Sequence, residues 1–135
     1  MALQFSVGVR AAMADSIETA TGTAPTLELR TGAPPATCAT ADSGTVVATM
    51  VLPSDWLTNP ATGAKALVGT WSDANGADSA GTVGHFRIKQ AATTHIQGIV
   101  TSTATGTGDL LLDNPTLTAG QAVSISSFTL TTANA

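Results

Sequence analysis

The residues with the greatest potential for chemistry gather in the stretch GHFRIKQ, residues 84–90. His85, Arg87 and Lys89 occupy alternate positions there, and His95 follows ten residues after the first histidine. Histidine titrates near neutral pH and can act as a general acid, a general base or a metal ligand. This row is therefore the first candidate for a catalytic or metal-binding site.

Strand parity predicts which of these side chains lie together. If 83–90 and 95–103 form an antiparallel hairpin, alternate residues point to opposite faces. The apolar residues Phe86 and Ile88 then face the core, and the register sets Lys89 opposite His95. The other face holds five polar side chains, namely His85, Arg87, Lys89, His95 and Gln97.

Three kinds of site compete for this polar face. An acid–base site would need a carboxylate beside the histidines, and covalent catalysis would need a serine or cysteine in register; neither is found. A metal site is disfavoured because strand geometry sets the two histidines about 10 Å apart, beside a lysine and an arginine that repel cations. We therefore predict a solvated strip that faces a partner, for example an acidic patch. A small hydrolase that uses His85 or His95 with an aspartate is the enzymatic alternative.

Two further features are of kinds that bind ligands in other proteins. The loop at 72–81 holds Asp73, Asn75 and Asp78, but it lacks the terminal glutamate of a helical calcium loop. We expect a surface turn there, and ion binding stays open. Trp56 and Trp71 are expected in the core or at an interface, whereas an exposed indole would favour glycan binding.

Composition argues against several classes of function. The 135-residue chain has 10% charged residues, a net charge of −4 and only five lysines and arginines, too few for the basic patch of a nucleic-acid-binding protein. Its low charge leaves much neutral surface for contact. The single cysteine, Cys38, is expected to be a small buried hydrophobe. We predict no secretory segment, membrane association, cofactor, metal or catalytic residue.

The first 22 residues contain the one helical pattern. Ser6 is a plausible N-cap and Gly22 follows the last periodic residue. We predict a helix of about four turns with one apolar stripe on the body. The stripe consists of Phe5, Val9, Met13 and Ile17.

The remainder of the chain predicts short strands separated by turn residues. We expect them over 26–31, 45–52, 64–71, 83–90, 95–103, 109–113 and 121–132. In the last strand Val123 and Ile125 differ in parity from Phe128 and Leu130, which predicts a bulge at 126–127. The fold class is mainly β, a jelly-roll-like antiparallel β-sandwich with one N-terminal α-helix. Residues 1–135 form a single domain, with the helix and its lead-in over 1–22 and the sandwich over 23–135.

Three segments, MALQFSVGVRAAMADSIETATG, GTWSDANGADSAGTVGHFRI and LTAGQAVSISSFTLTTANA, resemble a family of small structural proteins from tailed bacteriophages. The resemblance implies a capsid cement or decoration protein of the virion, with a jelly-roll body and no enzymatic activity. It would be made in the host cytoplasm and would bind the major capsid protein on the outer capsid surface. It would also bind itself, a homodimer being favoured over a trimer. The alternative is a tail or head-fibre module, structural or receptor-binding, with carbohydrate as one ligand.

Overall fold

The computed structural model describes residues 3–59 and 63–132, and its first element is the predicted helix. This helix, α1, spans Val7–Thr21. The Ser6 side chain accepts a hydrogen bond from the Val9 amide, and the Gly22 amide donates to the Glu18 carbonyl at 2.9 Å. Gly22 has a φ of +97°, a conformation that glycine adopts readily. Both predicted helix ends are therefore confirmed.

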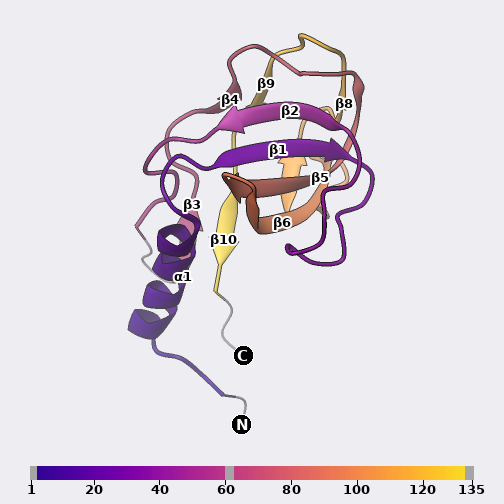
Figure 1. Cartoon of the computed structure of the whole chain (residues 1–135). Helices are drawn as coiled ribbons and strands as arrows, with labels where there is room; N and C mark the ends of the chain where they lie inside the picture. Colours follow the sequence, from indigo (N-terminus) through magenta and orange to yellow (C-terminus); the bar gives the residue numbers. More distant parts are fainter. Residues whose placement is uncertain (1–2, 60–62, 133–135) are drawn as a thin grey trace.

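Ten short strands follow α1 in the described part of the chain (Figure 1). The first five are β1 (Thr26–Thr31), β2 (Val46–Val51), β3 (Ala64–Ala66), β4 (Trp71–Asp73) and β5 (Gly81–Gln90). The others are β6 (Thr93–Ser102), β7 (Leu110–Leu112), β8 (Thr116–Leu117), β9 (Val123–Ile125) and β10 (Thr129–Thr131). The main sheet has the order β2-β1-β5-β6-β7, with β8 also pairing with β5. Two small ladders join β3 to β10 and β4 to β9.

The hydrophobic core lies against one face of the main sheet. In β1 and β5 the paired residues Leu27 and Ile88, like Leu29 and Phe86, are buried on this face. Phe128 packs against them from outside the main sheet, with its ring 5.9 Å from that of Phe86 in an edge-to-face arrangement. Such aromatic pairs add specific geometry to simple burial. The predicted inward face of the 83–90 strand is therefore confirmed.

The end of the chain passes from one ladder to the other. β9 pairs with β4, and after a break at 126–128 β10 pairs with β3. Val123, Ile125 and Phe128 are buried, and Leu130 packs against the core from a half-buried position. The parity change predicted as a bulge is thus a break between two strands, which still turns both apolar pairs inward.

Two other details differ from the sequence-based prediction. The segment expected as one strand over 64–71 is two strands, because β3 ends at Ala66 and β4 begins at Trp71. The β6–β7 pair is parallel, so the main sheet is mixed rather than purely antiparallel. The protein is mainly β with an N-terminal helix. Within the described residues, α1 is too short and too polar to cross a membrane.

Candidate functional site

The polar face of the β5–β6 hairpin lies on the side of the main sheet away from the core. Arg87 pairs with Gln97 and His85 with Ile99, as predicted. The register shifts after Ile88, so Lys89 lies opposite Thr94 rather than His95. β1 adds Glu28 and Arg30 to the same face, opposite Arg87 and His85 respectively.

The prediction that this strip is exposed to solvent is wrong for its three members on β5. Residues 32–45, which connect β1 to β2 and are called the covering loop below, lie over this face and contact its side chains. His85 is 0% exposed, Arg87 1% and Lys89 9%. Of the other two members, His95 is exposed and Gln97 is half-buried, with its Nε2 donating to the Pro35 carbonyl at 2.7 Å.

Arg87 binds the backbone of the covering loop. Its Nη2 lies 3.2, 3.0 and 3.0 Å from the carbonyl oxygens of Thr37, Cys38 and Thr40. A guanidinium suits this role because its planar fork presents several fixed donors. Arg87 therefore ties three carbonyls of the covering loop to the middle of the main sheet.

His85 holds the start of the same loop. Its Nδ1 lies 2.9 Å from the Gly32 carbonyl oxygen, and since a carbonyl only accepts, Nδ1 carries the proton. The loop approaches the strand closely here, because a Cβ placed on Gly84 would collide with the Gly32 backbone. Glycine at 84 thus allows the contact that fixes the His85 ring.

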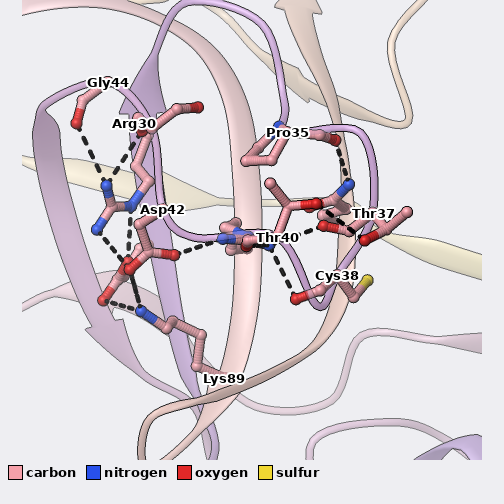
Figure 2. Close-up of polar contacts among 12 residues, drawn as sticks. Arg30, Pro35, Thr37, Cys38, Thr40, Asp42, Gly44 and Lys89 are labelled. Atoms are coloured by element: carbon pink, nitrogen blue, oxygen red, sulfur yellow. Dashed lines mark hydrogen bonds and ion pairs between the residues drawn. The ribbon is translucent and has the colours of Figure 1, made fainter.

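Asp42 is the anionic centre of this face. Its Oδ1 accepts from Arg87 Nη1 at 2.5 Å, and its Oδ2 accepts from Lys89 at 2.6 Å and from Arg30 at 3.1 Å. Figure 2 shows the Asp42 carboxylate between the Arg30 and Lys89 side chains. The hydrogen bond from Lys89, followed by that from Arg87, lowers the pKa of Asp42 despite its partial burial. Glu28 also pairs with Arg30, at 2.8 Å.

This cluster of Glu28, Arg30, Asp42, Arg87 and Lys89 is named the ionic cluster. Its cations are bound to carboxylates and loop carbonyls, so they are occupied in holding the covering loop. Among the described residues, three buried polar atoms beneath the loop have no protein partner: His85 Nε2, Arg87 Nε and Gln97 Oε1. These three atoms lie in the polar layer between the covering loop and the main sheet. The other polar groups of that layer bind the loop to the sheet.

The other residues predicted as candidate ligands form hydrogen bonds within the chain. Asp73 accepts from the Thr49 and Asn75 amides, and Asp78 accepts from the Thr49 hydroxyl, so the 72–81 loop uses both carboxylates to fix backbone. No cluster of three or more metal-ligating side chains occurs within 3–59 and 63–132. Cys38 is half-buried, with its thiol 3.8 Å from a carbonyl oxygen, rather than fully buried as expected.

Both tryptophans belong to the core. Trp56 and Trp71 are each 0% exposed, with ring centroids 6.0 Å apart. Their indole nitrogens donate to the carbonyls of Gly22 and Val68 respectively, each at 3.1 Å. Neither ring has a face open to a ligand.

Helix α1 packs on the body through its charged residues, not through the apolar stripe that was predicted to make the contact. Its charged residues bind the body: Arg10 donates to the Thr132 carbonyl at 3.3 Å, and Glu18 and the largely exposed Asp15 accept from Lys65 at 2.5 and 3.0 Å. Ala14 is buried beside them. The predicted contact through Phe5, Val9, Met13 and Ile17 is wrong, since the first three are exposed and Ile17 is half-buried.

Lys65 explains this orientation. Its side chain is 1% exposed, and burial alone would disfavour its charge. Hydrogen bonds to Glu18 and then Asp15 outweigh this desolvation and raise the pKa of Lys65. Glu18 also accepts from the Trp56 and Leu57 amides, each at 3.2 Å. The signal in the sequence was the Asp15–Glu18 pair, one turn apart on the charged side of the helix.

The largest group of exposed apolar side chains therefore lies at the N-terminus. Five of the seven exposed large hydrophobic residues in the described chain fall within residues 3–13. This set, named the N-terminal apolar face, surrounds the lead-in and the first half of α1 rather than one side of the helix, and it consists of Leu3 (73% exposed), Phe5 (38%), Val7 (54%), Val9 (47%) and Met13 (40%). Figure 1 shows α1 at one end of the molecule beside β3 and β10, with the preceding residues leading away from the sheets.

The ionic cluster and the N-terminal apolar face have different roles in the protein. The ionic cluster stabilises the chain internally, whereas the N-terminal apolar face is directed outward. Comparisons with protein-family models, with curated proteins and with solved structures found no match to this chain.

Proposed function

We propose that this chain is a non-enzymatic structural protein of a tailed-phage virion, which binds the outside of the capsid and stabilises contacts between capsomers. The observation that carries the proposal is the N-terminal apolar face, because large apolar groups held out to solvent mark surfaces that are buried in an assembly. The resemblance of the sequence to phage structural proteins supports a phage virion as the particle. The major capsid protein is then the principal partner, and no cofactor is required.

The basic side chains bind groups within the same chain, and this supports a structural role. All five lysine and arginine side chains bind groups of the same chain, and the scarce basic residues thus hold loops and helix in place. A protein that stabilises a shell must itself be rigid, and a loop fixed through its backbone meets that need. A jelly-roll-like arrangement, with the main sheet packed against the two small ladders, is the finer form of the fold within this proposal.

The experiment is a count of this chain in purified particles of the phage that encodes it, by quantitative mass spectrometry against the major capsid protein. We expect a fixed ratio set by capsid symmetry, and removal of the gene should yield particles that break at lower temperature. A handful of copies per particle, located at the tail, would replace the capsid role by the tail or fibre role. Absence from particles would overturn the proposal.

A further inference from the structure

The first half of β6 has a free edge on the side away from β5. β7 pairs only with residues 100–102 of β6. Just before them, the Ile99 carbonyl accepts from the Asp109 amide at 2.9 Å, and the Ile99 amide donates to Asp109 Oδ2 at 2.8 Å. Main-chain direction alternates along an antiparallel ladder, so the amide and carbonyl of Gln97 point the same way as those of Ile99. Within the described chain no strand pairs with Gln97 on this side.

β10 also has a free edge, on the side away from β3. The Phe128 carbonyl accepts from the Leu67 amide at 3.0 Å, so the main chain of Phe128 faces β3. By the same alternation, the amides and carbonyls of Thr129 and Thr131 face away from β3. Over residues 3–59 and 63–132, no strand pairs with β10 on that side. A strand edge with unpaired main-chain groups is a template for another extended segment.

The two free edges line the same cavity, which has a volume of about 310 Å³. This volume is at the lower end of the range for ligand pockets, about 300–1,000 Å³. The apolar wall of the cavity comes from the buried rings of Phe86 and Phe128 and from the half-buried side chains of Ile96 and Leu130. The cavity therefore combines main-chain donors and acceptors with room for an apolar side chain.

Asp109 gives this cavity a negative charge. It is exposed and contributes to the lining. A Cβ on Gly98 would lie 2.7 Å from both the Asp109 carboxylate and the Phe86 ring, so glycine at this position lets the two approach β6 together. All five lysines and arginines of the chain bind other groups. A segment that fills the cavity is therefore expected to bring its own cation.

We propose that this cavity binds an extended segment of a partner protein, which adds to the edge of β10 as a new strand. Alternate side chains of a strand point to opposite faces, so an aliphatic side chain of the segment packs against Phe86 and Phe128 while its neighbours face solvent. A lysine or arginine of the segment pairs with Asp109. In this mode of recognition, main-chain hydrogen bonds supply affinity and the pocket supplies specificity. The inference goes beyond the proposed function, because this surface shares no residue with the N-terminal apolar face and does not depend on the particle.

The test is a titration of the full ¹⁵N-labelled chain with a short synthetic peptide, acetylated and amidated, in which valine and threonine alternate between two terminal lysines. We expect shifts of the amide signals of Gln97, Thr129 and Thr131, and slower hydrogen exchange of these three amides when the peptide is bound. A peptide with glutamates in place of the lysines should bind more weakly. The difference between the two peptides should shrink at high salt, because salt screens exposed charges.

Two variants test the edge and the charge separately. Thr131→Pro removes a free donor but spares the pairing with β3, since proline is tolerated where the amide faces away from a ladder. It should weaken binding at least about fivefold, which corresponds to about 1 kcal/mol. Asp109→Asn keeps an oxygen for the Ile99 amide and should weaken binding of the lysine peptide about two- to fivefold at low salt. The matched control, Asp113→Asn, alters another exposed carboxylate and should leave binding unchanged. An unchanged spectrum at millimolar peptide, shifts confined to other residues, or wild-type affinity in either variant overturns the inference.

Discussion

Arg87 and Asp42 are 45 residues apart in sequence and are joined by a hydrogen bond of 2.5 Å, which links the middle of the main sheet to the covering loop. The same carboxylate accepts from Lys89 and Arg30. Asp42 thus brings three cations from two strands to one point. Because the loop also depends on Arg87 for three of its carbonyls, this single pair influences most of the loop.

Replacing Asp42 by asparagine should loosen the covering loop. The variant keeps the size of the side chain but leaves Arg30, Arg87 and Lys89 facing one another with less negative charge among them. We expect a loss of about 1–3 kcal/mol in the free energy of unfolding, measured in urea. Amide hydrogens of residues 36–43 should exchange faster, while those of β5 and β6 change less. The matched control, Asp55→Asn, alters an exposed carboxylate and should change neither measurement.

The contribution of Asp42 should depend on pH with a definite sign. The pKa of Asp42 is lowered in the folded protein, first by the hydrogen bond from Lys89, so its stabilisation is fully present above the ordinary value of 3.8. It is lost as the pH falls below 3.8 and through the folded pKa. The difference in unfolding free energy between wild type and Asp42→Asn should therefore be constant from about pH 5 to 7 and narrow below about pH 4. A difference that widens in acid would contradict this assignment.

The attachment of α1 should depend on Lys65. Lys65→Met replaces a buried ammonium by an apolar group of similar length and leaves Asp15 and Glu18 without their cation. Breaking a buried ion pair from one side costs about 3–5 kcal/mol. We expect faster exchange of α1 amides and lower stability. Adding Glu18→Gln to Lys65→Met should restore part of the loss, since the amide that replaces the Glu18 carboxylate carries no unpaired charge; a strictly additive double variant would contradict the pairing.

Much of the fold could be predicted because period-two patterns and turn residues mark strands locally. The register of Arg87 with Gln97 and the caps of α1 at Ser6 and Gly22 follow from such local rules. The break between β9 and β10 was visible as a change of parity. The parallel β6–β7 pair was not predicted, because which strands become neighbours depends on contacts between distant segments.

The candidate site was less predictable for the same reason. Parity correctly placed His85, Arg87 and Lys89 on the face away from the core, but parity cannot show that a loop from another part of the chain covers that face. The glycines and prolines of the covering loop predicted only an interruption of strands. Likewise, the apolar period of α1 was real, yet the buried Lys65 turned the charged side inward. In both cases an ion pair between distant residues decided the orientation.

The buried tryptophans allow a direct test of whether either indole binds glycans. Since Trp56 and Trp71 are fully buried and hydrogen-bonded, native fluorescence should lie to the blue of the unfolded protein and resist quenching by iodide. Oligosaccharides should leave the emission unchanged. The urea-unfolded chain serves as the control and should be quenched readily. Strong quenching of the native protein would contradict the burial of at least one ring.

Phe128 should couple the core to the attachment of α1. Its ring is 4% exposed and lies 5.2 Å from that of Trp71 and 5.9 Å from that of Phe86, at the point where the chain leaves β9. Phe128→Ala should cost about 3–5 kcal/mol through lost burial and the cavity that remains. Because β10 follows directly and pairs with the strand that carries Lys65, exchange should rise in α1 as well as in β9 and β10.

The control for Phe128 is Thr129→Ala, an exposed change in β10, which should leave both stability and α1 exchange near their wild-type values. Measuring exchange under conditions where global unfolding is rare separates local opening from complete unfolding. If Phe128→Ala lowers global stability without faster local exchange in α1, the helix is held by Lys65 independently of the core. If α1 opens together with β10, the apolar face that it presents is positioned by the packing of Phe128.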